Sequence, residues 1–142
     1  MDRSRAVDAG ALESKMNELV VIESPYAGRS SLPWPLSIIG RWWNRVQNVR
    51  YARALMRDSL MRGEIPIASH LLYTQPGILR DWIPEERSLG INAGFAWGRH
   101  AVKRIIGLNR GWSSGMRLGV DSAKNLGQKI EYRRLPGWGG ES

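Results

Sequence analysis

The stretch "LVVIESPYAG", Leu19 to Gly28, decides the fold. It opens with a continuous apolar run that is β-branched at its centre, and Ser24-Pro25 ends that run. A strand that is apolar on both faces is typical of a parallel sheet covered by helices on both sides. The stretch therefore predicts a buried strand over 19–22, with Ser24, Pro25 and Tyr26 in the loop that follows it.

The rest of the chain alternates between helical and strand patterns. Apolar residues recur at helical spacing, or gather in short runs bounded by turn residues. The predicted elements are a helix over 44–63, a strand over 64–73, a helix over 82–101, a strand over 102–108, a helix over 116–127 and a strand over 128–135. This order predicts an α/β protein: a three-layer, flavodoxin/Rossmann-like domain with a parallel sheet of about four to five strands.

The pattern divides the chain into a weakly ordered lead-in (1–17), a single domain (18–135) and a C-terminal tail (136–142). A tryptophan-rich insert, 29–44, interrupts the domain after the first strand. It contains "RSSLPWPLSIIGRWW", whose prolines and glycine predict a loop with room for one helical turn. The insert is a lid, a subunit contact or a partner surface; packing over the domain's own core is an equal alternative.

Composition restricts the classes of function. The chain has 142 residues, no cysteine and a net charge of +8. The missing thiols exclude disulfides and cysteine-ligated metals and make the cytoplasm the default location. No apolar run approaches the roughly 18 residues of a membrane helix, and the polar N-terminus is not a signal peptide. The charge favours anionic partners, with a merely soluble basic surface as the alternative.

Candidate site residues follow the strands, because ligands of open parallel sheets bind outside the carboxyl ends of the strands. Ser24 and Tyr26 follow the first strand, Ser69-His70 the second, and residues 109–115 the third. Ser113 or Ser114 with Gly115 would begin a helix whose free N–H groups favour an anion, although such a motif also serves as a plain cap. With two histidines and no nucleotide-binding glycine fingerprint, we expect neither a metal site nor a cofactor.

Two candidates also have structural interpretations, which the sequence favours for the glutamates and leaves evenly balanced for the tyrosine. Glu85 and Glu86 suit the first turn of a helix, where carboxylates favour the positive end of the dipole; alternatively, one is an acid or base in the cleft. Tyr26 is either a core aromatic or a wall for a stacked base.

Five motifs together resemble one group of proteins. They are "SPYAG", "NVRYARALMRDSLMRGEIPIASHLLYTQPG", "PEERSLGINAG", "SSGM" and "AKNLGQKIEYRRL". From about Val20 to Leu135 the chain is similar to small, often phage-encoded members of the nucleoside 2-deoxyribosyltransferase-like superfamily. The resemblance implies a flavodoxin-like fold that binds a nucleoside or nucleotide, and a glutamate that attacks the anomeric carbon to cleave or exchange the N-glycosidic bond.

The resemblance also implies roles for particular residues. The matching positions are Ser24 and Tyr26 in the substrate loop, Asn48 in the first helix, His70 after the second strand, Glu86 at the next helix start, and Ser114, Gly115 and Met116 in an "SxGM" phosphate loop. Relatives usually continue "SxGMxxE", whereas this chain has Gly119 there. Either Glu86 supplies the catalytic carboxylate, or the protein binds a nucleotide without turnover.

The sequence therefore predicts a nucleoside- or nucleotide-binding protein, with cleavage or exchange of the N-glycosidic bond left open. The alternatives are a non-catalytic sequestering protein and an interaction protein of a larger phage assembly that uses the insert. Expected partners are the small ligand and a second copy bound through the insert, but no membrane. Nucleic acid is disfavoured because the arginines are not interleaved with aromatics. For a phage protein the location would be the host cytoplasm.

Overall fold

The computed structural model describes residues 18–140, so the predicted lead-in 1–17 lies outside the described residues. The elements are β1 (Leu19–Glu23), α2 (Leu36–Met61), β2 (Ile65–Ile67), α3 (Ser69–Leu72), α4 (Pro84–Gly98), β3 (Lys103–Gly107), α5 (Ser114–Asn125) and β4 (Lys129–Arg133). Apart from the short helix α3, they follow the alternation expected from the sequence.

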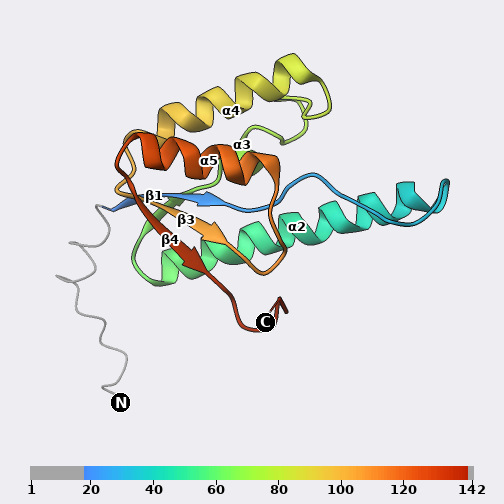
Figure 1. The fold of residues 1–142 in the computed structure, drawn as a ribbon, viewed down its shortest axis with the longest axis horizontal. Helices are drawn as coiled ribbons and strands as arrows, with labels where there is room; N and C mark the ends of the chain where they lie inside the picture. Colours follow the sequence, from blue (N-terminus) through green and yellow to red (C-terminus); the bar gives the residue numbers. More distant parts are fainter. Residues whose placement is uncertain (1–17, 141–142) are drawn as a thin grey trace.

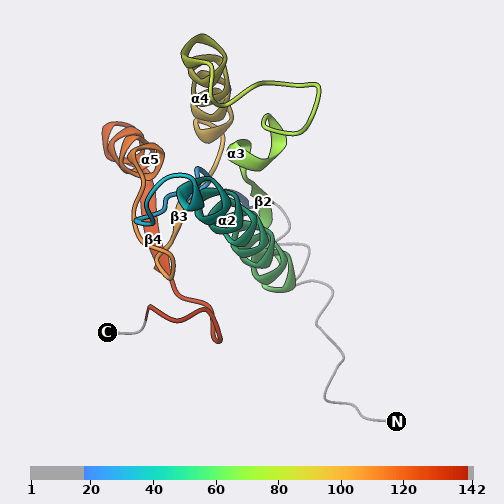
Figure 2. The same ribbon diagram turned by 90° about the vertical axis from the view of Figure 1, so that its right-hand side faces the viewer.

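The four strands form one sheet of order β2-β1-β3-β4, and every neighbouring pair is parallel. Helix α2 covers one face of the sheet, and α4 and α5 cover the other (Figures 1 and 2). The predicted three-layer, flavodoxin/Rossmann-like α/β fold is thus confirmed.

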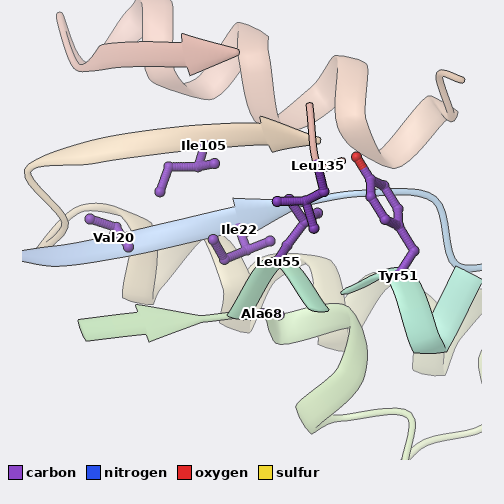
Figure 3. Packing of buried hydrophobic residues seen from close by; sticks show 7 residues of the cluster. All are labelled: Val20, Ile22, Tyr51, Leu55, Ala68, Ile105 and Leu135. Atoms are coloured by element: carbon purple, nitrogen blue, oxygen red, sulfur yellow. The ribbon is translucent and has the colours of Figure 1, made fainter. Parts of the chain in front are cut away.

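Successive residues of the central strands pack into different layers, as the pleat requires. Val20, Ile22 and Ile105 face α2, where Tyr51 and Leu55 complete a fully buried cluster (Figure 3). Ile106, the next residue of β3, belongs to a second cluster that Met116 and Val120 of α5 close on the opposite face. The continuous apolar run of β1 therefore reflects burial on both sides.

The tryptophan-rich insert differs from its prediction. We expected a loop over most of 29–44, but α2 begins at Leu36 and includes the whole of "LSIIGRWW". The two prolines precede the helix instead of interrupting it, with Pro35 at the N-cap position, where a missing N–H costs nothing. The first turns of α2 extend beyond the sheet (Figure 1).

The second strand is also shorter than predicted. Only Ile65–Ile67 pair with β1, and the chain turns into α3 at Ser69. This strand lies at the edge of the sheet and has a neighbour on one side only. The hydroxyl of Thr74 donates to the carbonyl of His70 (2.5 Å) and helps to hold the helical turn.

The predicted tail packs on the domain up to residue 140. Leu135 is buried in the α2-facing cluster, and the ring of Trp138 lies 5.2 Å from that of Tyr51. The side chain of Asn109 donates to the carbonyls of Leu135 and Gly139. Asn109 therefore ties the loop after β3 to the segment after β4.

Candidate functional site

A cleft lies where the fold changes direction. From β1 the chain passes over one face through α2 to β2, then returns over the other face through α4 to β3, on the far side of β1. The carboxyl ends of β1 and β3 are therefore neighbours at a topological switch point, the usual ligand position in open α/β sheets. The cleft there has a volume of about 390 Å³.

The structure brings most of the predicted binding residues together. The predicted residues that line the cleft are Ser24, Tyr26, Asn48, His70, Ser114 and Gly115. Met116 does not join them, since its side chain is buried against Ile106 and Val120. Its backbone N–H contributes instead by donating to the N-cap hydroxyl of Ser113 (3.2 Å), which begins α5.

Ser24 and His70 form a hydrogen-bonded pair in the cleft wall. The Oγ of Ser24 lies 2.9 Å from the Nε2 of His70, across 46 positions of sequence. Burial lowers the pKa of His70 to about 4, so its imidazole is neutral near pH 7. This pair connects β1 to α3 and offers hydrogen-bonding groups to a ligand without adding charge.

Asn48 positions Arg110 in another part of the cleft lining. Its Oδ1 accepts from the Nε of Arg110 (2.7 Å), and its Nδ2 donates to the carbonyl of Ala27 (3.3 Å). One buried side chain of α2 thereby fixes the loops that follow β1 and β3.

A second cation, Arg87, lies at the beginning of α5. Arg87 of α4 donates from Nη2 to the Oγ of Ser114 (3.2 Å), and its Nε lies 4.0 Å from Asp81. Arg29, Arg87 and Arg110 all line the cleft, against the two carboxylates of Glu23 and Asp81. With His70 neutral, the lining has an excess of positive charge next to Ser114 and Gly115 at the N-terminus of a helix, an arrangement that favours an anion.

The last residue of β1, Glu23, was not among the predicted site residues. It lines the cleft, and its carboxylate accepts a hydrogen bond from the Nη1 of Arg104 (3.0 Å). Burial raises the pKa of Glu23 to about 7, although the charge and the hydrogen bond of Arg104 oppose the shift. A carboxyl group with this pKa is present in both protonation states near neutrality.

Glu23 also occupies the space above Gly119. A Cβ added at residue 119 would lie 2.5 Å from the Oε1 of Glu23 and 2.7 Å from its Cδ. The space that a side chain at residue 119 would need is therefore filled by the carboxylate of Glu23.

Arg104, the partner of Glu23, is itself buried to 1% exposure. Its Nε donates to the Oε1 of Gln128 (3.3 Å), while its Nη2 has no hydrogen-bond partner within the described chain. Gly98 of α4 leaves the space that this guanidinium needs, since a Cβ there would collide with Nη2. The helix and the ion pair thus depend on one another.

Glu86, the predicted catalytic residue, lies beside a smaller cavity of about 90 Å³ that Glu23 and His70 also line. Its Oε2 accepts from the backbone N–H of Arg80 (3.2 Å) and from the Nε of the same residue (2.7 Å). The side-chain hydrogen bond of Arg80 lowers the pKa of Glu86. The carboxylate therefore closes the loop before α4, in line with the helix-start interpretation, and still borders the second cavity.

The sequence held partial signals for the residues that were missed. Glu23 directly precedes Ser24, so a carboxylate at the end of a buried strand marked it. Arg110 lies in the 109–115 loop that was expected to border the site. Arg87 adjoins Glu86 but carried no signal of its own, because its position depends on how α4 packs against α5.

Other kinds of site receive no support from the described residues. Residues 18–140 contain no group of three or more His, Asp or Glu side chains placed to hold a metal ion. No helix in the same range combines the length and the apolar character that crossing a membrane requires.

The fold and the cleft define a parallel α/β domain with a switch-point site. Residues 18–133 match the model of a family described as "Domain of unknown function (DUF7768)", and the chain belongs to that family. No curated protein and no solved structure matches the chain.

Proposed function

We propose that the switch-point cleft binds a nucleotide, with the phosphate at the α5 end and the sugar next to Glu23. Arg87, Arg110 and the first N–H groups of α5 supply the donors that a phosphate needs. Tyr26 and Trp112 line the same cleft and offer aromatic surfaces against which a base can stack. The resemblance to the nucleoside 2-deoxyribosyltransferase-like superfamily supports the same ligand class.

The proposal extends to cleavage or exchange of the N-glycosidic bond, and one observation carries this step. The carboxylate of Glu23 fills the space above Gly119, the position at which the resemblance implies a nucleophilic glutamate. Glu23 thus replaces the missing residue from a different element. It takes over the role that the sequence assigned to Glu86, whose carboxylate Arg80 holds at the start of α4.

The chemistry follows that of retaining glycosidic cleavage. An oxygen of Glu23 forms a bond to the anomeric carbon while the bond between that carbon and the base nitrogen breaks. The electron pair of the broken bond leaves with the base, which takes up a proton from solvent water. Water, or a second base in an exchange reaction, then attacks the same carbon, gives up a proton to solvent and releases the carboxylate. A pKa near 7 leaves a large fraction of Glu23 ionised for the first step.

A second candidate function is nucleotide binding without turnover. The hydrogen bond of Arg104 to Glu23 favours it, because a carboxylate paired with a buried guanidinium is a weaker nucleophile. Such a protein would hold its ligand in the same cleft and release no base.

One experiment separates the two functions. A thermal-shift screen over nucleosides and nucleoside monophosphates identifies a ligand, which at about 100 times its Kd should stabilise the fold by roughly 2.7 kcal/mol. Release of free base from that ligand is then followed by chromatography for wild type, Glu23→Gln and Glu86→Gln. The enzymatic proposal expects turnover by wild type and Glu86→Gln and a loss of about 100-fold or more in Glu23→Gln.

The remaining outcomes are equally informative. If Glu86→Gln is the inactive variant, the original assignment of the carboxylate is right and Glu23 is structural. A ligand that stabilises wild type but is never cleaved supports the binding function. If no nucleoside or monophosphate stabilises the fold, the proposal as a whole is wrong.

A further inference from the structure

Helix α2 carries an exposed stripe that the cleft does not use. Leu36, Ile39, Trp43 and Val46 follow one another at alternating intervals of three and four residues. The first three expose 54%, 65% and 56% of their surface. We call this stripe, together with its continuation toward the C-terminus of α2, the seam, and we define these four residues as its apolar half.

The same spacing continues into a cationic half. Arg50, Arg53 and Arg57 extend the stripe at intervals of four, three and four residues, and all three are exposed. None of them takes part in an ion pair within residues 18–140. Residues 24–57 contain six arginines and no acidic residue, so no neighbour in sequence neutralises them.

The seam lies on the side of α2 that faces away from the sheet. Asn48, Tyr51 and Leu55, the buried positions, make up the opposite side of the helix. The apolar half belongs to the part of α2 that extends beyond the domain (Figure 1). Flanking side chains enlarge its apolar surface, since Trp34, Ile38 and Trp42 are 78%, 54% and 55% exposed. Nothing in the described chain covers this surface.

The spacing indicates what kind of partner would cover it. Alternating intervals of three and four residues generate the seam of helix-on-helix packing. The stretch from Leu36 to Arg57 is about 33 Å long at 1.5 Å per residue, enough for three heptads of contact. A groove of about 500 Å³ between α2 and α3 borders the cationic half at Arg53 and Met56 and gives a second helix room to settle.

We propose that this seam binds an amphipathic helix of a partner protein, with apolar residues opposite the apolar half and carboxylates opposite Arg50, Arg53 and Arg57. The exposed surface of Leu36, Ile39 and Trp43 amounts to roughly 350 Å², taking 150–250 Å² for each large residue, and the cationic half extends the contact toward the roughly 800 Å² that one partner contributes to a standard interface. The carboxylates satisfy the unpaired guanidinium groups. This inference does not depend on the function of the cleft.

A second copy of the chain fits the seam less well. In a parallel pair the arginines would face arginines, and in an antiparallel pair they would face Leu36, Ile39 and Trp43. Neither arrangement supplies a carboxylate, because the seam contains none. Placing guanidinium groups in an interface without anions costs free energy.

A membrane surface also fits less well. A helix that lies in a lipid interface separates its cationic residues from its apolar face around the helix axis. Here Arg50, Arg53 and Arg57 prolong the same stripe as Trp43 and would lie at the same depth. Within the seam the charge division runs along the helix axis, and a matching partner helix would be divided in the same way.

Two synthetic helical peptides test the proposal. Both carry leucines opposite the apolar half and glutamates opposite the cationic half, one in the order for parallel pairing and one for antiparallel pairing. Matched peptides carry lysine in place of glutamate. We expect fluorescence anisotropy to show binding of one glutamate peptide that is about tenfold or more tighter than its lysine counterpart and that weakens at high salt.

Charge exchange provides the decisive comparison. The variant Arg50→Glu/Arg53→Glu/Arg57→Glu should no longer bind the glutamate peptide and should bind the lysine peptide instead. The control variant Arg99→Glu/Arg117→Glu/Lys124→Glu has the same change in net charge on other exposed positions and should keep the wild-type preference. Trp43→Ser should weaken binding of the glutamate peptide by about tenfold, with the thermal transition unchanged because the side chain is exposed.

Several results would overturn the proposal. They are failure of both glutamate peptides to bind, an equal loss of binding in the control variant, and unchanged binding by Trp43→Ser. Sedimentation that shows a dimer which Trp43→Ser dissociates would assign the seam to a second copy. Binding to phosphatidylserine-containing vesicles that Trp43→Ser abolishes would assign it to a membrane surface.

Discussion

The carboxylate of Glu23, in the wall of the cleft, lies directly against the bare backbone of the buried Gly119. A Cβ at residue 119 would lie 2.5 Å from the Oε1 of Glu23, closer than two such atoms can approach. Because residue 119 is a glycine, the carboxylate from the end of β1 has room to occupy this place. The two residues are sterically coupled, although they belong to different elements.

This coupling is testable by a double-mutant cycle. In an ordinary helix, Gly→Ala stabilises by about 1 kcal/mol. We expect Gly119→Ala to give little or none of that gain in wild type, because the new methyl group displaces Glu23 from Arg104. In the Glu23→Ala background the methyl group has room, and the full gain should appear in urea denaturation. Equal effects of Gly119→Ala in the two backgrounds would show that the residues are independent.

The pKa of Glu23 gives a stability signature of its own. Its folded-state pKa of about 7 is above the ordinary value of 4.5, so the folded protein binds more protons than the unfolded chain between these values. The free energy of unfolding should therefore fall as pH rises from 4.5 to 7 through this group. Glu23→Gln removes that decline, so the stability of the variant relative to wild type should increase over the same interval. A constant difference from pH 4 to 8 would contradict the raised pKa.

Glu64 should show the opposite dependence. Burial raises its pKa, but hydrogen bonds from Arg133, Lys103 and Ser59 together outweigh this and lower it to about 2. The stabilisation is present above pH 4.5 and is lost as pH falls toward 2. Glu64→Gln removes the 2.8 Å ion pair to the buried Arg133, which keeps Glu131 at 3.0 Å, and should cost about 1.5–3 kcal/mol at neutral pH.

The difference between Glu64→Gln and wild type should become smaller in acid, as chemical denaturation at several pH values would reveal. Glu85→Gln is the matched control, because Glu85 is exposed and should leave the stability within about 0.5 kcal/mol of wild type. A loss in Glu64→Gln that stays constant down to pH 3 would mean that the ion pairs of Glu64 do not depress its pKa.

The core of the fold was predictable because its signals are local. Val20 to Ile22 form a continuous apolar run, and that pattern is typical of a strand in a sheet with helices on both faces. The beginning of α2 was not predictable in this way. Its prolines and tryptophans resemble a loop, and an outward apolar face such as Ile39 and Trp43 contradicts the usual pattern of a helix on a domain surface.

The site was predictable only to the level of the sheet edge. Ser24 and His70 were both placed there from strand order, but their hydrogen bond spans 46 positions and depends on the packing of α3. Glu23 owes its raised pKa to burial, which outweighs the opposing effect of Arg104, 81 positions away, and it owes its position to the missing side chain of Gly119. Burial and pairing of this kind arise from tertiary structure, so no local pattern could reveal them.

Asn109, in the loop after β3, should be a sensitive polar position outside the ion pairs. The Oδ1 of Asn109 accepts from the Tyr51 hydroxyl (2.8 Å) and from the backbone N–H of Leu135 (2.7 Å), all within the buried interior. Asn109→Ala leaves these donors without an acceptor and should cost about 2–4 kcal/mol. The exposed Asn125→Ala is the control, with an effect within about 0.5 kcal/mol. A mild effect of Asn109→Ala in thermal unfolding would mean that water replaces the lost acceptor.

The phosphate end of the cleft leads to a prediction about ligands. Arg87 donates to Ser114 at the start of α5, so its guanidinium lies where an anion on the first N–H groups of that helix would bind. We expect a nucleoside monophosphate to bind more tightly than its nucleoside. Arg87→Ala should remove most of that difference, since a hydrogen bond to a charged group contributes about 1.5–3 kcal/mol, or roughly 10- to 100-fold in affinity.

Calorimetry on the matched pair of ligands distinguishes a phosphate contact from a structural role of Arg87. A phosphate contact lowers the affinity for the monophosphate and leaves the affinity for the nucleoside within about twofold, because only one ligand carries the group that the arginine binds. A structural role through Ser114 and the loop before α5 lowers both affinities together. Arg117→Ala on the exposed side of α5 should change neither affinity. Equal losses of affinity for the two ligands in Arg87→Ala would mean that the phosphate binds at Arg110 instead, or outside the cleft.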